Sequence, residues 1–245
     1  MLSVCMATYN GEKYIKEQIT SILVQLSPED EVVISDDGST DTTIKIVASL
    51  ADPRIKLIRN KGMHGYVGNF ENVLKHANGD FVFLSDQDDI WMEGKVNTVL
   101  SYLMAGNDLI IHNAELVDGN GESLGHDYYS CMHSHSGFWA NFFVPRYLGC
   151  CMAFNRKVLD YVLPFPTYKR GHDYQIGCYA NLRFKTRFIP DVLIKYRRHG
   201  MNASPSSEKS NNSKMMKLKK RMSMAHAIIL KVIEKDLLHK SKLIK

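Results

Sequence analysis

Residues 81–91 read FVFLSDQDDIW, and this stretch decides the fold. Four apolar, β-forming residues come first, as is typical of a strand that is buried on both faces. Three carboxylates follow within four positions, at the strand end where open α/β sheets bind ligands. Such neighbours repel one another unless a cation neutralises them, and magnesium or manganese accepts oxygen ligands of this kind. The stretch therefore predicts a metal and diphosphate site; the alternative is an acidic turn that caps a helix beginning near Met92.

The first hundred residues alternate four times between an apolar run and an amphipathic helical pattern. The expected strands are residues 2–6, 31–35, 55–58 and 81–84. Short polar connections join them to the helices, which is the pattern of a mostly parallel sheet covered on both faces. We therefore predict an α/β fold with a single central sheet. In such a sheet, the polar loops after Met6, Ser35 and Ser85 gather along one edge.

The pattern becomes less regular after residue 105. We expect a strand at residues 109–112 with residues 114–117 as its partner, and a loop at residues 126–141. The remaining expected elements are strands at 150–154, 186–189 and 192–196, helices at 156–163 and 174–182, a polar linker at 204–213, and a basic helix at 214–238.

The charge of this 245-residue chain is concentrated in its tail. Up to Ser204 there are 20 Lys and Arg against 23 Asp and Glu, and from Pro205 onward there are 11 against 3. A basic body that coats nucleic acid is therefore excluded. No apolar run reaches the length of a membrane-spanning helix. The five cysteines form no C-x-x-C pair and no signal peptide is recognised, so we expect reduced thiols in a cytoplasmic protein.

The three polar loops offer groups that suit a nucleotide. Asp37 can accept a hydrogen bond from a base N–H, and the backbone of residues 7–9 can hold base and ribose. Asp86 and Asp88 can then meet the ribose and a metal ion. Each loop alone has a plainer explanation, since Asp, Gly and Ser also build turns and helix caps. Because all three loops fall in register on one sheet, the shared site is favoured.

These motifs, in this order, resemble glycosyltransferase family 2. The resemblance rests on LSVCMATYN at residues 2–10, DDGSTD at 36–41, NGD at 78–80 and DQDDIW at 86–91. The last motif is similar to that of bacterial rhamnosyltransferase-like members that build polysaccharides. The resemblance implies a GT-A fold over residues 1–204, with a nucleotide-binding half at 1–105 and an acceptor-binding half at 106–204. It also implies metal-dependent, inverting transfer from a nucleotide-diphosphate sugar to a saccharide or lipid-linked saccharide acceptor.

The resemblance also implies residue roles. Asp37 matches the aspartate that contacts the nucleobase, Asp86 and Asp88 match the D-x-D pair, and Asp173 stands at the position of the catalytic base. Asp88 is expected to be the direct ligand of Mn²⁺ or Mg²⁺. The full candidate set is Ala7, Thr8, Tyr9, Glu12, Asp37, Lys61, Asn69, Asp86 and Gln87 for the nucleotide sugar, Asp88, Asp86 and His199 for the metal, Trp91 and His172 on the acceptor side, and Asp173 for catalysis.

Physical chemistry supports a carboxylate such as Asp173 in this reaction. Inverting transfer is a single displacement, so the acceptor hydroxyl loses its proton as it attacks. A divalent cation stabilises the departing diphosphate. The alternatives are an N-cap for Asp173, core packing for Trp91, a structural role for His172 and an exposed histidine for His199.

The basic tail carries apolar residues at alternating steps of three and four. They are Met215, Leu218, Met222, Ala225, Ile229 and Val232. This stripe fits a helix at a membrane surface, and it equally fits a helix packed on its own domain or on a second subunit. We expect peripheral contact with the inner face of the cytoplasmic membrane, or a homodimer, through this helix.

Two other function classes share some of these sequence features. A sugar nucleotidyltransferase also binds a nucleotide and a metal, but its first loop usually contains glycine and arginine, and residues 7–11 contain no Arg or Lys. A non-catalytic binding protein with a GT-A-like fold would not need Asp37, Asp86, Asp88 and Asp173 together. A glycosyltransferase is therefore the function that the sequence predicts.

Overall fold

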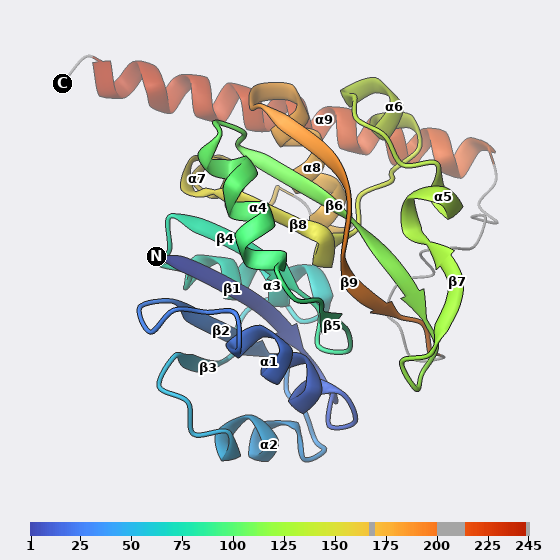
Figure 1. Cartoon of the computed structure of the whole chain (residues 1–245). Coiled ribbons are helices and arrows are strands. Elements are labelled where there is room, and N and C mark those ends of the chain that lie inside the picture. The colour runs from blue at the N-terminus through green and yellow to red at the C-terminus, as the bar shows by residue number, and fades with distance from the viewer. Residues whose placement is uncertain (167–169, 200–213, 244–245) are drawn as a thin grey trace.

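The computed structural model describes residues 1–166, 170–199 and 214–243, and within them a nine-stranded sheet forms the centre of the molecule. Its order is β3-β2-β1-β4-β8-β6-β9-β5, with β7 paired to β6 (Figure 1). The strands are β1 (Leu2–Thr8), β2 (Glu31–Asp36), β3 (Ile55–Arg59), β4 (Phe81–Ser85), β5 (Ile90–Trp91), β6 (Leu109–Val117), β7 (Ser123–Asp127), β8 (Met152–Asn155) and β9 (Thr186–Arg197). Parallel ladders hold most of the paired residues, so the predicted α/β fold with a mostly parallel sheet is confirmed.

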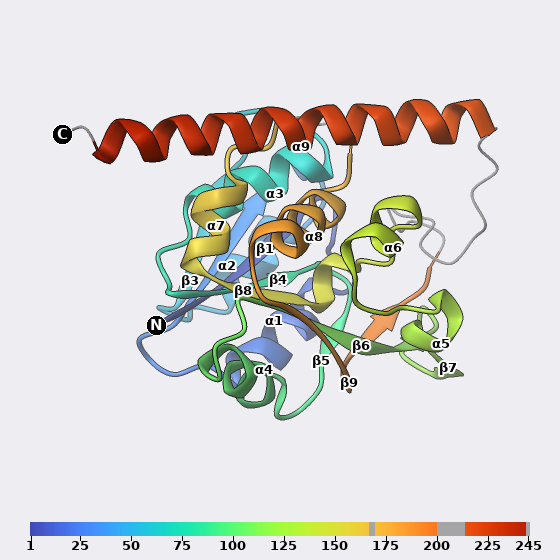
Figure 2. The same cartoon turned by 90° about the horizontal axis from the view of Figure 1, so that it is seen from above.

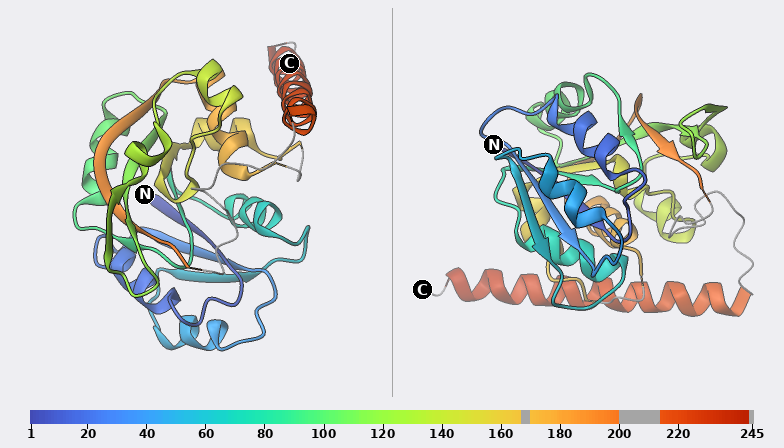
Figure 3. Two further views of the ribbon diagram at one scale, coloured as in Figure 1. Left: turned by 90° about the vertical axis from the view of Figure 1, so that its right-hand side faces the viewer. Right: turned by 90° about the horizontal axis from the view of Figure 1, so that it is seen from below.

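Helices cover both faces of this sheet. They are α1 (Ile15–Leu23), α2 (Thr43–Ser49), α3 (Tyr66–Lys75), α4 (Lys95–Met104), α5 (Tyr128–Met132), α6 (Phe138–Phe143), α7 (Arg156–Val162), α8 (His172–Arg183) and α9 (Lys214–Leu243), with a 3₁₀ turn, η1, at Gly149–Cys151. Helices α1 and α4 lie on one face, and α3, α7 and α8 lie on the other (Figure 2). Helix α9 runs along the outside of the second group (Figure 3).

The first half of the sheet brings three loops together. Strands β1, β2 and β4 are buried along nearly their whole length because helices cover both of their faces. All pair in parallel, with Met6 opposite Ile34 on one side and Ser85 on the other. The three strands therefore end side by side, and the loops that follow them open at the same edge of the sheet.

The second half corrects two sequence predictions. Residues 114–117 are not a partner strand; they continue β6, which runs parallel to β9 on both sides of a register shift near Asn113. The Asn113 side-chain oxygen accepts the Ala114 N–H at 2.8 Å. This bond accounts for the polar residue that interrupts the apolar run of β6. Residues 126–141 are not a loop, since they include α5 and most of α6. Asp127 caps α5 by accepting the Ser130 N–H at 3.0 Å.

The connection after the acidic stretch also differs from the prediction. Ile90 and Trp91 form β5, which pairs antiparallel with β9, so the helix expected near Met92 begins only at Lys95.

In the described part of the chain, none of the helices combines the length and the apolar character that crossing a membrane requires.

Candidate active site

The loops after β1, β2 and β4 border one cavity of about 340 Å³. The predicted site residues that line it are Ala7, Thr8, Tyr9, Asp37, Asn69, Asp86, Gln87, Asp88, His172 and Asp173. Three of the predicted carboxylates, at positions 37, 88 and 173, are far apart in the sequence and meet here. The spatial arrangement that the candidate site requires is therefore present, while the chemical role of each residue stays a prediction.

Gln87 joins the first loop to the acidic loop. Its Oε1 accepts hydrogen bonds from the Thr8 hydroxyl at 2.6 Å and from the Tyr9 N–H at 2.9 Å. Its Nε2 donates to the Tyr9 carbonyl at 3.0 Å. Gly11 makes room for this amide, because a Cβ at that position would collide with the Gln87 Oε1. Gln87 thus holds the wall of the cavity in shape.

Asp37 is fixed by groups from the connection between β3 and α3. Its carboxylate accepts from Asn60 Nδ2 at 2.7 Å and from the Gly65 N–H at 2.7 Å. The His64 Nδ1 lies 2.9 Å from the same carboxylate. The Asp37 side chain is 11% exposed, so these partners leave only a small part of it open to the cavity.

Asn69 ties together the ends of two strands. Its Nδ2 donates to the carbonyls of Thr8 at 3.1 Å and Ser35 at 2.9 Å, which belong to β1 and β2. Its Oδ1 is buried and has no hydrogen-bond partner among the described residues. Asn69 thus lies in the wall of the cavity and holds the two strand ends together.

Burial and neighbouring negative charges favour the protonated form of two of the acids at the end of β4. Burial raises the pKa of Asp86 to about 7, and the charges of Asp88 and Asp173 add to this shift. Burial, followed by the charges of Asp88 and Asp86, also raises the pKa of Asp89. Like charges this close favour the neutral form. A bound cation would remove that repulsion.

A positive charge lies underneath the acids. Lys95 is buried, and its Nζ donates to the Cys150 carbonyl at 3.0 Å and stands 4.1 Å from the centre of the Trp91 ring. Burial lowers the pKa of this lysine to about 8, although the charges of Asp89 and Asp86 act in the opposite direction. Lys95 belongs to this acidic site, and nothing in the sequence pattern distinguishes it from a surface lysine at the start of a helix.

A group of possible metal ligands among the described residues shares only Asp86 with the predicted set of Asp86, Asp88 and His199. One oxygen from each of Asp86 and Asp89 and the sulfur of Cys150 lie within 4.8 Å of one another, as a metal-binding group requires. Burial raises the pKa of the Cys150 thiol, so it stays protonated and is a poor ligand. Magnesium and manganese prefer carboxylate oxygens, which Asp86 and Asp88 offer at the cavity.

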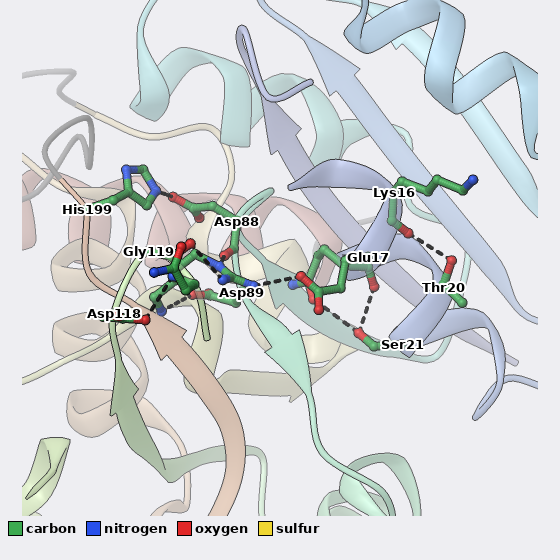
Figure 4. A network of polar contacts seen from close by, with 12 residues as sticks. Lys16, Glu17, Thr20, Ser21, Asp88, Asp89, Asp118, Gly119 and His199 are labelled. Atoms are coloured by element: carbon green, nitrogen blue, oxygen red, sulfur yellow. Dashed lines mark hydrogen bonds and ion pairs between the residues drawn. The ribbon is translucent and has the colours of Figure 1, made fainter. Parts of the chain in front are cut away.

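Asp88 is paired with His199. The His199 Nε2 lies 2.8 Å from Asp88 Oδ2, and the two side chains are 12% and 13% exposed (Figure 4). The Tyr14 ring stacks on His199 with 4.9 Å between ring centroids. The predicted closing segment continues into residues 200–202, which lie outside the described residues.

Arg197 holds the main chain around this pair. Its Nε donates to the Asp88 carbonyl at 2.8 Å, its Nη1 to the Gly119 carbonyl at 3.2 Å and its Nη2 to Glu17 Oε2 at 2.7 Å. The Arg197 N–H donates to Asp89 Oδ1 at 3.0 Å. Figure 4 shows that this network joins α1, the acidic loop and the turn after β6. The side chain is 2% exposed, so Arg197 positions the loop and does not reach into the cavity.

Asp173 stands in the first turn of α8. Its Oδ1 accepts the Tyr174 N–H at 2.7 Å, but α8 begins at His172 with Gly171 as its N-cap residue, so the alternative of an N-cap role for Asp173 is wrong. Asp173 lines the cavity. Burial raises the pKa of Asp173 to about 6. The carboxylate is therefore ionised near neutral pH and is more basic than an ordinary aspartate.

His172 lies beside Asp173 in an apolar setting. Its ring stacks on Phe70 with 3.7 Å between centroids and an angle of 20°. Gly149 lies against the other side, because a Cβ there would come within 2.7 Å of the His172 Nε2. Burial lowers the pKa of His172 to about 3, so the ring is neutral. Neither ring nitrogen has a partner among the described residues.

Four predicted residues do not line the cavity, namely His199, which is paired with Asp88, and Glu12, Lys61 and Trp91. Glu12 accepts from the Thr42 N–H at 2.9 Å and from the Thr42 hydroxyl at 2.6 Å, which ties the start of α1 to α2. Lys61 is exposed in the connection after β3. Trp91 is 3% exposed and packs in the core against Phe83, so core packing is the observed role of this ring.

The cavity wall also contains residues that the sequence reasoning did not single out as site residues. They are Gly65, Tyr66, Phe70, Tyr147, Leu148, Gly149 and Tyr196. Aromatic residues in a helical pattern look like core, and η1 has no sequence signature. A close approach of the chain to a ligand is one reason for a glycine such as Gly149, but one sequence does not identify which glycine serves it.

A family comparison decides what kind of protein this is. The sequence model of glycosyl transferase family 2 matches residues 3–163, more than half of the chain. The chain belongs to glycosyl transferase family 2. The fold described above is thus the fold of this family.

Individual members of the family are similar over part of their length. The glucosyltransferase WfgD of Escherichia coli, named as acting on α-D-GlcNAc-diphosphoundecaprenol with UDP-Glc, is 34% identical over 49% of this chain and 48% of its own. The dTDP-rhamnosyl transferase RfbG of Shigella flexneri is 38% identical over 42% of this chain and 38% of its own. The match thus spans less than half the length of these curated relatives.

Solved structures of other transferases share the fold. Staphylococcus aureus TarS 1–349 in complex with UDP-GlcNAc superimposes with a TM-score of 0.68 at 20% identity, over 95% of this chain and 66% of that one. The mannosyltransferase PcManGT of Pyrobaculum calidifontis, in complex with GDP-Man and Mn²⁺, gives 0.58 at 21% identity, over 80% and 56%. At these identities the likeness establishes the GT-A fold alone.

Proposed function

We propose that this glycosyltransferase is metal-dependent and inverting, and that it moves a sugar from a nucleotide-diphosphate sugar to a saccharide or lipid-linked saccharide acceptor. The observation that carries the proposal is the meeting of Asp37, Asp86, Asp88 and Asp173 at one cavity. The volume of that cavity is within the range usual for small-molecule sites. The synthesis of bacterial surface polysaccharide is the process in which such a reaction belongs.

The donor binds to residues 1–105 in this proposal. The loop at residues 7–9 holds the nucleoside, and Asp37 accepts a hydrogen bond from the base. Asp88 and His199 hold a divalent cation, and Asp86 contacts the ribose or a water on that cation. Mn²⁺ or Mg²⁺ bound there would neutralise the charge that grows on the departing diphosphate. Gln87 and Asn69 act indirectly by keeping the two loops in place.

The acceptor binds to residues 106–204, and Asp173 is the base. The acceptor oxygen forms a bond to the anomeric carbon while its proton passes to the Asp173 carboxylate. The bond between the anomeric carbon and the diphosphate oxygen breaks, and the nucleoside diphosphate leaves with the electron pair. The neutral ring of His172 lines the same space, while both of its nitrogens are buried.

The named relatives support the chemical class of both substrates. WfgD is named for a UDP-glucose donor and a diphosphoundecaprenol-linked acceptor, and RfbG for a dTDP-rhamnosyl donor. TarS 1–349 was solved with UDP-GlcNAc, and PcManGT with GDP-Man and Mn²⁺. These proteins use different bases and sugars, so the proposal names the donor class and leaves the sugar to experiment.

A thermal-shift panel with UDP-, GDP- and dTDP-sugars, with and without Mn²⁺, tests the proposal. One donor is expected to raise the melting temperature only when Mn²⁺ is present, because a ligand that binds the folded state stabilises it. Asp88→Ala is expected to abolish the metal-dependent part of that shift, and the exposed Glu29→Ala is the matched control. Unchanged, metal-sensitive binding by Asp88→Ala in calorimetry would refute the assignment of Asp88. Release of pyrophosphate from a nucleoside triphosphate would identify a nucleotidyltransferase instead.

A further inference from the structure

Helix α9 has two apolar faces that point in opposite directions. One face packs against the chain's own domain through Met224, Ala227 and Ile228, which are at most 7% exposed. Lys231 lies on the same face, and its Nζ donates to the carbonyls of Leu163 at 3.0 Å and Pro164 at 2.8 Å. This face is therefore already occupied and fixes how the helix lies on the domain.

The opposite face is apolar and open to solvent. It carries Met215, Leu218, Met222, Ile229 and Ile233, each between 50% and 69% exposed. At 100° per residue these positions fall on the side of the helix away from Met224 and Lys231. Four of the five belong to the stripe that the sequence pattern singles out. A large exposed apolar surface of this kind marks a place of interaction.

The apolar surface continues onto α6. Trp139, Phe143 and Val144 are 68%, 50% and 50% exposed. Arg221 of α9 joins the two helices, because its Nη2 donates to the Phe143 carbonyl at 3.1 Å and its guanidinium lies 5.3 Å from the Phe143 ring centre. Figure 2 shows α6 beside the N-terminal half of α9. We call the exposed residues of α9 and α6 together the α9–α6 surface.

The charge around this surface selects the kind of partner. Residues 214–243 contain nine Lys and Arg against two Asp and Glu. Arg221, Lys231 and Lys235 donate to carbonyls of the domain, and four of the other six basic residues fall within residues 214–220. A second copy of the chain would bring two positive helices together, in either orientation. An anionic bilayer instead satisfies both properties, because apolar side chains enter the boundary region while lysines and arginines reach the headgroups.

We infer that the α9–α6 surface docks on an anionic lipid bilayer, such as the inner face of a cytoplasmic membrane. Co-flotation of the full chain with phosphatidylglycerol–phosphatidylethanolamine vesicles tests this, against vesicles of phosphatidylcholine alone. Binding to the anionic vesicles is expected to be at least tenfold tighter, and to weaken as salt is raised. This readout does not involve sugar transfer, so its failure would be distinct from failure of the proposed reaction.

Variants locate the surface. Ile229→Asp combined with Ile233→Asp is expected to reduce anionic vesicle binding at least tenfold, while circular dichroism and melting temperature stay unchanged because both side chains are exposed. The control is Val24→Asp with Met104→Asp, two other exposed apolar positions on α1 and α4, across the sheet from α9. Equal binding to both vesicle types, or full binding by the α9 variant, would overturn the inference. A dimer in light scattering that the α9 variant dissociates, without vesicle binding, would do so as well.

Discussion

Replacing Asp173 with asparagine is expected to remove catalysis and to stabilise the fold at the same time. Asparagine keeps the shape of the side chain and can still accept the Tyr174 N–H that Asp173 accepts at 2.7 Å. It carries no negative charge and cannot take a proton from the acceptor. A purely structural role for Asp173 would lead to a different outcome, in which the replacement leaves transfer intact.

The pKa of Asp173 gives the size and the sign of the stability effect. Burial raises it from 3.8 to about 6, so the folded chain holds the proton more tightly than the unfolded chain does. The ionised carboxylate therefore destabilises the fold by about 3 kcal/mol at pH 7, at roughly 1.4 kcal/mol for each pKa unit. This penalty is absent below pH 3.8, grows as the pH rises towards 6, and is complete above it.

Two measurements check the prediction. Chemical denaturation of Asp173→Asn at pH 7 is expected to give a free energy of unfolding about 3 kcal/mol above that of the original chain, and a difference below about 1 kcal/mol at pH 4. Donor binding, followed by thermal shift, is expected to be unchanged, while transfer falls by at least about a hundredfold, as loss of a general base implies. Transfer at the normal rate would refute the base. A stability difference that does not depend on pH would refute the buried, ionised carboxylate.

Three further predictions concern the same site. The rate of transfer is expected to fall about tenfold for each pH unit below 6, as Asp173 becomes protonated, and a flat pH–rate profile between 5 and 7 would contradict this. Gln87→Leu removes three hydrogen bonds between loops, so we expect a loss of roughly 1–3 kcal/mol in urea denaturation and a raised KM for the donor. Arg197→Lys keeps the charge but not the fork of donors, so the metal concentration for half-maximal activity is expected to rise while the KM for the acceptor stays the same.

The sequence was sufficient where the determining signals are local. An apolar run followed by acids, as at residues 81–89, indicates a buried strand and a polar loop without knowledge of any distant residue. Parallel pairing then brings such loops together, because β1, β2 and β4 end side by side at the same edge of the sheet. This is why Asp37, Asp86 and Asp88 could be assigned to one cavity from the sequence alone.

The sequence was insufficient where a residue is placed by a partner far along the chain. Trp91 is drawn into the core because β5 pairs with β9, about a hundred residues later. Arg197 reads as a surface arginine near a histidine, yet its partners include Glu17, 180 positions earlier. Lys95 likewise depends on Cys150. No periodicity of residues 90–105 contains this information.

The sequence predicts the apolar stripe of the tail correctly, but it does not show which face of the helix packs on the domain. The stripe from Met215 to Val232 lies on a helix as predicted, but the residues that anchor α9 to the domain are Met224, Ala227 and Ile228. A helix with two apolar faces gives a weak periodic signal, since apolar residues recur at nearly every turn position. Only the packing partner tells which of the two faces is occupied.

Three of the buried polar atoms without a partner in the described part of the chain belong to residues that line the cavity, and this has a consequence for stability. Among the described residues, Asn69 Oδ1 and both ring nitrogens of His172 are buried without a hydrogen bond, and all belong to residues that line it. Burial raises the pKa values of Asp86 and Asp173, so ionisation of these two carboxyls at the same cavity costs free energy. A buried polar group without a partner is costly unless something else satisfies it. A bound cation would relieve the repulsion at Asp86, so a donor that binds together with a metal is expected to stabilise the fold.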